Sequence, residues 1–328
     1  MTESTLSSQF TDLQKAVAHH LGLGIDSAKW SADQTAIIAM IIKRGLRQFY
    51  HPPRIYPDEP SHQWSFLKPT VTLTTVGTYS TGTVEVSSGT CTLTDGVWPS
   101  WAATHGTLTI GTTEYAITTR DGDTELTVVG DDVAAETTYS LTHSGNYDLP
   151  EDFGGIEGNM TYEPSEHKED ILIVGEGKIR NLRGGQTARS CPIYAAVRPK
   201  ECAGTSVGQR FEIMFFPIPN DAYDLSYKKI ILASALTGTI KYPYGGAMHA
   251  ETLEASCIAM AELQEDEKKG PMYDYFIERL TASIQIDKTA YSAEFLGYNR
   301  DNSDAVHRDG GRNDRHRGNF LVTYNGEI

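Results

Sequence analysis

The spacing between apolar residues changes twice along this 328-residue chain, and that change constrains the fold more than any other feature of the sequence. Before Thr70 and after His249, apolar residues recur every three or four positions, as on one face of an amphipathic helix. From Thr70 to Asp148 they alternate with polar residues, and turn residues interrupt the pattern at short intervals, as in antiparallel strands. The chain is therefore predicted to be α+β, with helical segments on both sides of β-rich ones.

Three helices are predicted, over Thr5–His20, Ser31–Tyr50 and His249–Asp287. Ser31 is a good N-cap, because a serine hydroxyl accepts a hydrogen bond from a backbone N–H that the helix leaves free. Gly270 and Pro271 are expected to break or kink the third helix, because proline lacks the N–H that a helix interior needs. The three helical segments are expected to pack together as a bundle.

Residues 70–148 are expected to form a small all-β module, a barrel or a sandwich, inserted between the helices. Strands are predicted at 82–86, 91–94, 107–110, 114–118, 125–129 and 139–142. The segment is rich in threonine and strongly acidic. Arg120 is its one Lys or Arg against ten Asp and Glu, so it carries −9 of the chain's net charge of −15.

The next part of the chain is a Pro- and Gly-rich elbow followed by a second group of strands. The strands are predicted at 159–162, 171–174, 193–197, 210–216 and 224–229. The last two are expected to form a hairpin, because Pro217, Pro219, Asn220 and Asp221 between them are turn residues. The organisation expected is N-terminal helices at 1–69, the inserted module at 70–148, the hairpin region with the C-terminal helices at 149–297, and an extended arm at 298–328.

The C-terminal arm combines a polar stretch with an apolar end. Between Tyr298 and Gly318 arginines alternate with aspartates and apolar residues are few, so this stretch cannot bury enough surface to fold alone. Large apolar side chains return at Phe320, Leu321, Val322 and Tyr324. A short apolar strand on a polar tether is typical of an element that docks onto a partner.

The sequence contains no residue pattern typical of an enzyme. The glycines of DFGGIEG are not followed by the Lys and Ser or Thr of a phosphate-binding loop, and no serine lies in GxSxG. Four cysteines are scattered without a CxxC pair or a histidine cluster, so free thiols are expected at Cys91, Cys191, Cys202 and Cys257. The chain is therefore expected to be no enzyme and to hold neither a metal nor a cofactor.

Trp98 and Trp101, in the sequence WPSW, are the candidate binding residues of the β module. They would either form an exposed aromatic platform for a sugar or fill one end of a small core. The second alternative is favoured, because so small a module needs large side chains to bury enough area.

Charge and hydropathy bear on two further classes of function. A net charge of −15 argues against wrapping duplex DNA, because Lys and Arg supply most of that affinity. It is compatible with the wall of a conduit, which must repel passing phosphates. No apolar run approaches the roughly 20 residues that a membrane helix needs, and the first ten residues lack the pattern of a signal peptide. The protein is expected to be made in the cytoplasm and kept or assembled there.

The order of these elements resembles the head-to-tail adaptor, or connector, proteins of tailed bacteriophages. The stretches that carry the resemblance are RGLRQFYHPP (44–53), HQWSFLKP (62–69), YDLPEDFGGIEG (147–158), GQRFEIMFFPIPNDAYDLSYKK (208–229) and YPYGGAMHAETLEASCIAMAE (242–262). The family pattern is a helical bundle joined to a β-rich region and a long C-terminal arm. The threonine-rich module departs from the compact members of the family and looks like an insertion.

The resemblance implies a structural virion protein in the neck between head and tail, assembled in the host cytoplasm. It would form a homo-oligomeric ring, by analogy of twelve copies, beneath the portal protein and above a tail or nozzle protein. The arm residues Phe320, Leu321, Val322 and Tyr324 would dock on the portal, and genomic DNA would pass without sequence-specific binding. Two alternatives stay open: a stopper or tail-completion subunit, and a tail-associated glycan-binding protein that uses the β module.

Overall fold

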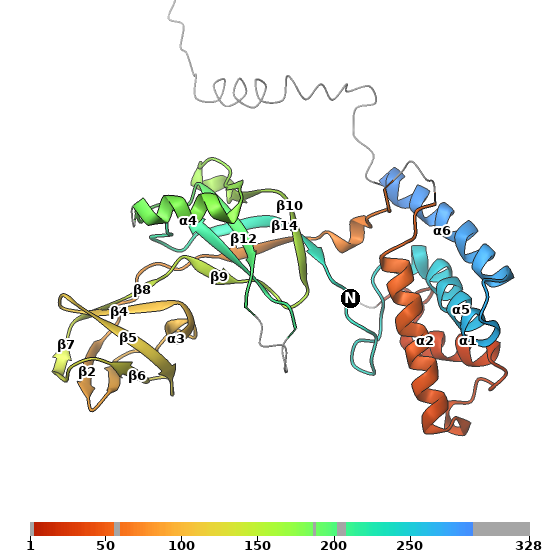
Figure 1. Cartoon of the computed structure of the whole chain (residues 1–328), viewed down its shortest axis with the longest axis horizontal. Helices are drawn as coiled ribbons and strands as arrows, with labels where there is room; N and C mark the ends of the chain where they lie inside the picture. The colour runs from red at the N-terminus through yellow and green to blue at the C-terminus, as the bar shows by residue number, and fades with distance from the viewer. Residues whose placement is uncertain (1–2, 56–59, 186–187, 202–207, 291–328) are drawn as a thin grey trace, which may run out of the picture. The chain divides into compact units, whose positions relative to one another are not determined.

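The fold is α+β, as the sequence predicts, with six α-helices and three sheets in the part of the chain that is described (Figure 1). The computed structural model describes residues 3–55, 60–185, 188–201 and 208–290. The chain divides into two compact units, Met1–Ile284 and Gln285–Ile328, and all three sheets belong to the first. The expected arm at 298–328, with its four apolar residues, lies outside the described residues.

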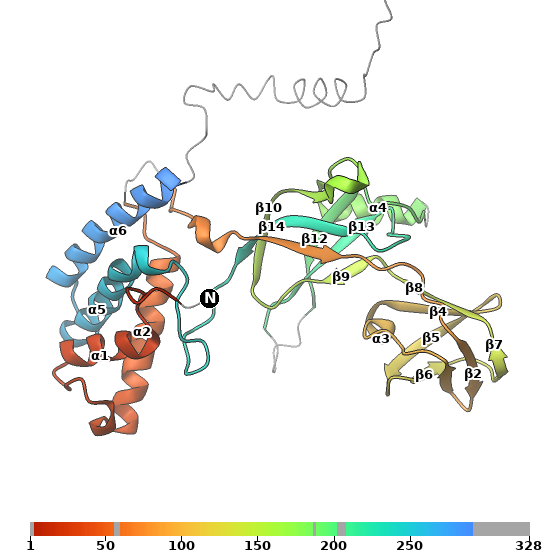
Figure 2. The ribbon, with the colours of Figure 1, turned by 180° about the vertical axis from the view of Figure 1, so that it is seen from behind.

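Helices from both sides of the β region pack around one apolar core. They are α1 (Phe10–His20), α2 (Ala32–Tyr50), α5 (Ala250–Asp266) and α6 (Pro271–Ala290), seen from two sides in Figures 1 and 2. Leu13, Ile38, Leu253, Phe276 and Leu280 are among the side chains buried between them. None of the helices in the described ranges is both long enough and apolar enough to cross a membrane.

The sequence predicted the ends of α2 correctly and the start of α1 wrongly. Ser31 caps α2 as expected: its hydroxyl accepts from the Gln34 N–H at 3.2 Å, and the Gln34 side chain accepts from the Ser31 N–H at 2.8 Å. The first helix begins at Phe10 rather than Thr5. Leu6, which seemed to extend its apolar face, is 79% exposed, so no packing stabilises a helix there.

Helices α2 and α5 approach each other closely at Gly45. A Cβ atom on Gly45 would lie 2.7 Å from the Cα atom of Cys257. Ser256 uses the same close approach, because its hydroxyl donates to the Gly45 carbonyl oxygen over 2.9 Å. The absence of a side chain at this one position therefore sets the separation of the two helices.

The expected break in the last helix is present. Helix α5 ends at Asp266 and α6 begins at Pro271, where the missing N–H of proline costs nothing in the first turn. The Glu262 carboxylate, 7% exposed, accepts hydrogen bonds from the N–H groups of Gly270, Met272 and Tyr273. It satisfies N–H groups at the start of α6 that the helix itself leaves free.

The threonine-rich segment forms a single seven-stranded sheet of order β7-β2-β3-β6-β5-β4-β8. Its strands are β2 (Thr83–Ser87), β3 (Thr90–Thr94), β4 (Gly106–Ile110), β5 (Thr113–Arg120), β6 (Glu125–Val129), β7 (Val133–Thr137) and β8 (Tyr139–His143), and a short helix, α3 (Ala102–His105), precedes β4. The sheet is a curled half-barrel with β7 and β8 at its edges (Figure 1). β7 pairs with β2 irregularly, with a register shift between Val84 and Val86.

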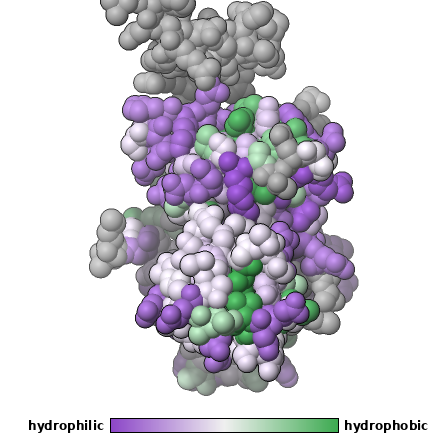
Figure 3. Space-filling model, turned by 90° about the vertical axis from the view of Figure 1, so that its left-hand side faces the viewer, coloured by the Kyte–Doolittle hydropathy of each residue, from purple (hydrophilic) through white to green (hydrophobic). Residues whose placement is uncertain are grey.

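The surface of this sheet is mostly of near-neutral hydropathy. The face in Figure 3 is dominated by such residues, with small hydrophobic patches among them, as a threonine-rich surface should be. Large apolar side chains such as Trp98, Leu108 and Leu126 are buried on the inner side. The alternation of threonine with apolar residues therefore reflects one buried and one solvated face.

Both ends of the segment expected to form this module belong to other sheets. β1 (Thr70–Thr74) pairs with β14 (Asp224–Ile231), and β9 (Asn146–Asp148) pairs with β13 (Phe211–Phe216). The seven-stranded sheet therefore starts at Thr83 rather than Thr70. The alternating pattern is the same in β1 as in β2, so the pattern could not assign strands to sheets.

The expected hairpin between 210–216 and 224–229 is wrong. β13 lies in a four-stranded sheet of order β11-β12-β13-β9, with β11 (Leu172–Ile173) and β12 (Tyr194–Pro199), whereas β14 is the central strand of a sheet of order β1-β14-β10. After β13 the chain turns away: Ile218 makes a parallel bridge with Arg189 and donates its N–H to the Ala188 carbonyl. Pro217 and Pro219, which looked like a tight turn, flank this bridge instead.

Two further segments differ from the sequence-based expectation. The elbow at 149–158 becomes largely strand, since β10 (Phe153–Tyr162) runs through its glycines with register shifts between Phe153 and Gly155 and between Glu157 and Thr161. Helix α4 (Glu176–Gly185) was not predicted from the sequence. It buries little more than Ile179, so its apolar pattern is too weak to predict a helix.

Replacing Gly45 by Ala is expected to destabilise the protein by about 1–3 kcal/mol, because the new methyl group overlaps the α5 backbone. Alanine favours a helix by roughly 1 kcal/mol over glycine, so any loss must come from this overlap. Gly177→Ala, also in a helix but with nothing within 4 Å of the new atom, is the matched control. Urea unfolding measures both variants, and equal stability of the two would contradict the prediction.

Candidate functional site

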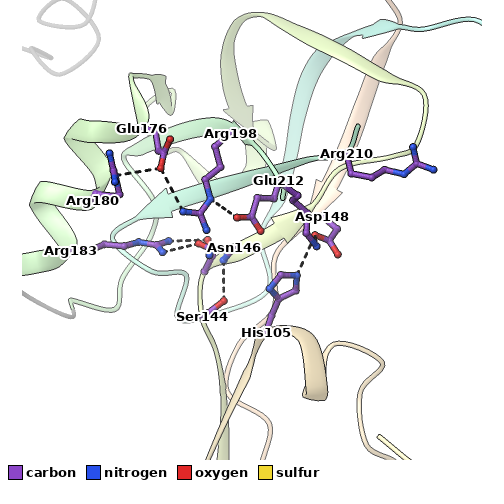
Figure 4. Close-up of polar contacts among 12 residues, drawn as sticks. His105, Ser144, Asn146, Asp148, Glu176, Arg180, Arg183, Arg198, Arg210 and Glu212 are labelled. Carbon is purple, nitrogen blue, oxygen red and sulfur yellow. Dashed lines mark hydrogen bonds and ion pairs between the residues drawn. The ribbon is translucent and has the colours of Figure 1, made fainter. Parts of the chain in front are cut away.

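Charged and titratable side chains gather where the chain passes from β8 into β9. We call this group the junction cluster; it comprises His105, His143, Asp148, Arg183, Arg198, Lys200 and Glu212. Figure 4 shows members of the cluster projecting toward one another from α3, β9, β12, β13 and α4. Ion pairs and hydrogen bonds connect these buried and half-buried side chains, and we therefore take the cluster as the candidate site.

Arg183 holds the crossing strand through its backbone. Its guanidinium donates to the carbonyl oxygens of Phe215 (2.7 and 3.2 Å) and Gly145 (3.0 Å) and to the Asn146 side chain (2.7 Å). Gly145 has a φ of 78°, and a Cβ there would lie 2.9 Å from the guanidinium. A glycine at this position is therefore required both by the backbone angle and by the approach of Arg183.

A chain of alternating charges leads from α4 into the four-stranded sheet. Arg180 and Arg198 both contact the Glu176 carboxylate, at 3.3 and 3.6 Å, and Arg198 donates from Nε to Glu212 Oε1. Glu212 is 5% exposed. Burying a carboxylate is costly unless it is paired, and Arg198 provides the partner.

Asp148 lies between a histidine and a lysine. Lys200 Nζ is 2.7 Å and His105 Nε2 is 3.4 Å from Asp148 Oδ1. Partial burial, the largest single influence, would raise the pKa of Asp148, but Lys200 and His105 together hold it below its ordinary value. Asp148 is therefore an anion at neutral pH.

His143 forms the apolar side of the cluster. Its ring stacks on Tyr147 with centroids 4.2 Å apart, meets the edge of Trp101 at 5.0 Å, and accepts from the Gly145 N–H at Nδ1 over 3.0 Å. Burial first, and then the nearby His105, Arg189 and Arg183, lower the pKa of His143 to about 3, against a smaller opposing effect of Asp148. The ring is thus held neutral, because a charged imidazole would be desolvated beside other cations.

A hollow of about 450 Å³ opens beside these rings. Trp101, His105, His143, Tyr147 and Asp148 are among the residues that line it. It combines aromatic faces with a carboxylate and an imidazole, which is the composition of a small polar ligand site.

Trp98 and Trp101, the two tryptophans of WPSW, differ in how deeply they are buried. Trp98 is 1% exposed and donates from Nε1 to the Thr124 carbonyl over 3.1 Å, so it belongs to the core of the module. Trp101 is half-buried at the edge of the hollow. The favoured alternative, packing in the core, is thus correct for Trp98, and no platform of two exposed rings is formed.

The cysteines in the described residues are free thiols, as predicted, at Cys91, Cys191 and Cys257. Cys202 lies outside the described residues. Burial raises the pKa of Cys257 to about 12 and that of Cys91 to about 11, so both thiols stay protonated at neutral pH.

One set of residues in the cluster has the chemistry to hold a metal ion. His105, Asp148 and Glu212 each place a donor atom within 4.8 Å of the others. The sequence did not indicate that these three residues form a set. His105 and Asp148 are 43 positions apart, Asp148 and Glu212 are 64 positions apart, and none of the three lies in a motif. The register of β9 on β13 brings the two carboxylates together, and that pairing has no local sequence signal.

The remaining contacts of the cluster are ion pairs, hydrogen bonds and ring contacts, which fix the end of β8 against β9, β13 and α4. Comparison with protein-family models and with curated proteins found no match to this chain. The chemistry of the site and the arrangement of the elements are what bear on function.

The free energy of unfolding is expected to fall as the pH drops from about 6.5 to about 3 because of His143. Its ordinary pKa is 6.5 and its pKa in the folded chain is about 3, so over this range the unfolded chain binds the proton more readily. Within this range, the loss of unfolding free energy caused by His143 approaches about 1.4 kcal/mol per pH unit. Urea unfolding of the wild type and of His143→Gln, measured at steps between pH 7.5 and 4, tests it.

The variant should lose part of this pH dependence. His19→Gln, on the exposed side of α1, is the matched control and should keep it. Parallel pH profiles for the wild type and His143→Gln would show that His143 does not titrate as stated.

Proposed function

We propose that this chain is a head-to-tail adaptor of a tailed bacteriophage: a non-enzymatic virion subunit that forms a ring beneath the portal protein and lines the DNA channel. The observation that supports this best is the arrangement of the helices. α1 and α2, which precede the β region, share one core with α5 and α6, which follow it. The resemblance to the adaptor family implies this plan: a helical bundle joined to a β-rich region and followed by an arm, here at 298–328.

Exposed apolar side chains on the helical part are consistent with contacts between subunits. Ile37 and Met40, three positions apart on one face of α2, are 43% and 39% exposed. The segment between β14 and α5 exposes Leu232, Ile240, Tyr242, Tyr244 and Met248. Exposed apolar side chains are available for contacts between subunits, and a ring needs two different patches on each subunit.

The acidic surface of the threonine-rich sheet is consistent with a conduit for DNA. Among these carboxylates, Asp121 accepts hydrogen bonds from the hydroxyls of Thr127 and Thr119, which lower its pKa and favour its charged form. Fixed negative charge on the channel side of a ring would repel phosphates and keep DNA from binding as it passes.

A second candidate, a tail-associated glycan-binding protein, is favoured by the hollow beside Trp101. Ser100, Thr104 and Asp148 add hydroxyl and carboxylate groups to its lining, and sugars are commonly held by an aromatic face together with such groups. Binding of the full chain to an oligosaccharide panel, abolished by Trp101→Ala, would favour this candidate over the adaptor. A stopper or tail-completion subunit differs from the adaptor in the neighbour it contacts.

Removing the apolar end of the arm is expected to abolish joining to heads while the subunit stays folded. The change is Phe320, Leu321, Val322 and Tyr324 all to Ser, which removes side chains whose burial on the portal would each contribute roughly 1.5–3 kcal/mol. Sedimentation of the variant with portal-containing heads and retention of packaged DNA measure the effect.

Substituting Arg308, Arg312 and Arg315 of the polar stretch by Ser is the matched control and should weaken joining far less, because charged side chains at an interface contribute more to orientation than to affinity. If the apolar variant joins heads and retains DNA as well as the wild type, the docking role of the arm is wrong.

The assembled form gives a separate test. A reconstruction of the virion neck should show this chain as a closed ring, with twelve copies expected from the family. A single copy, or a two-fold dimer, in the particle would contradict the adaptor proposal.

A further inference from the structure

We propose that His105, Asp148 and Glu212 form a binding site for one divalent cation of the zinc class. The proposal departs from the expectation, drawn from the sequence, that no metal is bound. It does not depend on the adaptor function. Three separate observations in the junction cluster lead to it.

The first observation is the position of the two carboxylates. Asp148 on β9 is the direct register partner of Glu212 on β13. Like charges directly opposite each other on paired strands are destabilising, unless a cation lies close to both. Figure 4 shows the Asp148 and Glu212 side chains near each other at this edge of the sheet.

The second observation is the position of His105 Nε2. The side chain is 10% exposed, and the contact of Nε2 with Asp148 Oδ1, at 3.4 Å, is longer than an ordinary hydrogen bond. A buried ring nitrogen held by so long a contact is poorly satisfied, and coordination of a metal ion would satisfy it better. Figure 4 shows His105 directed from α3 toward Asp148.

The third observation is the chemistry of the donors. One imidazole nitrogen and two carboxylate oxygens lie within 4.8 Å of one another. Zinc takes such ligands at about 2.0–2.2 Å in tetrahedral sites, with water in a remaining position. The three donor atoms must therefore approach one another to bind the ion. The half-exposed Asp148 side chain can make this movement.

Two cations in the cluster compete with a metal ion for the carboxylates. Arg198 donates to Glu212 Oε1, and Lys200 Nζ lies 2.7 Å from Asp148 Oδ1. A metal ion bound through Glu212 Oε2 would leave the contact of Arg198 with Oε1 in place. Lys200, 35% exposed, has to move into solvent or share Asp148 with the ion. Lys200 therefore competes with a metal ion for the Asp148 carboxylate.

This competition gives the sharpest experiment. The full-length protein is treated with EDTA, dialysed, and titrated with ZnCl₂ by calorimetry, with Co²⁺ absorption as a second measure of coordination. We expect one equivalent per chain. Lys200→Met should bind Zn²⁺ at least about fivefold more tightly, because the ion no longer competes with the ammonium group. His105→Ala should bind at least about tenfold more weakly, as expected when a ligand is lost.

The controls separate this site from other zinc-binding groups. The double variant His19→Ala and His20→Ala removes the two adjacent histidines of α1 and should bind like the wild type. Glu212→Gln is a second ligand variant, although loss of the Arg198 pair could unfold it; Lys200→Met is free of that difficulty, since it removes a partly exposed cation. Any one of three results would overturn the proposal. They are the absence of binding at one equivalent per chain, unchanged affinity of His105→Ala, and an affinity of Lys200→Met that is equal to or weaker than that of the wild type.

Discussion

The antiparallel pairing of β1 with β14 is the constraint on which the rest of the fold depends. It joins residues 150 positions apart, where the Thr74 hydroxyl donates to the Asp224 carboxylate, and it closes a loop that contains both other sheets. The buried Thr75 completes the closure: its N–H and hydroxyl donate to the carbonyls of Tyr223 and Asp221, and its hydroxyl accepts from the Tyr223 N–H. Because β1 follows the first helices and β14 precedes α5, the same pairing brings the two halves of the bundle together. The entropic cost of closing so long a loop grows slowly with length, so a five-residue ladder with these added bonds can offset it.

How much the sequence could predict depends on how local the determining interaction is. The start of α2 is determined by Ser31 and Gln34, and the break before Pro271 by proline itself, so both were predicted correctly. Strand β6 was predicted at both ends, because alternation of buried and exposed residues within the strand defines it. The failed hairpin after Phe216 is the opposite case, since the partners of β13 and β14 lie more than ten residues away and turn residues do not specify them. The junction cluster was missed for the same reason: Asp148 and Glu212 become neighbours through strand register, which no local pattern records.

Negative charge is used in two different ways in this protein. On the surface of the curled sheet, carboxylates such as Asp121 have hydroxyl neighbours and remain solvated, so they contribute to the field around the molecule rather than to its stability. In the junction cluster each carboxylate has a cation within reach, and Glu212 is almost fully buried with Arg198. Removing one member of such a buried pair leaves the other unpaired, which is far more costly than losing an exposed ion pair. The Arg198–Glu212 pair is thus expected to tolerate substitution poorly, while the acidic surface tolerates it well.

The edge strand β7 has a consequence for how the chain behaves at high local concentration. An open sheet has two edges with free backbone groups, and a regular edge can pair with the same edge of another molecule and start aggregation. β7 is a poor template for this, because it pairs irregularly with β2 and Glu136 within it has a left-handed φ of 61°. The bend and the charge interrupt the flat ladder that an incoming strand requires. Many copies synthesised together would therefore stay separate at this edge and remain available for specific association elsewhere.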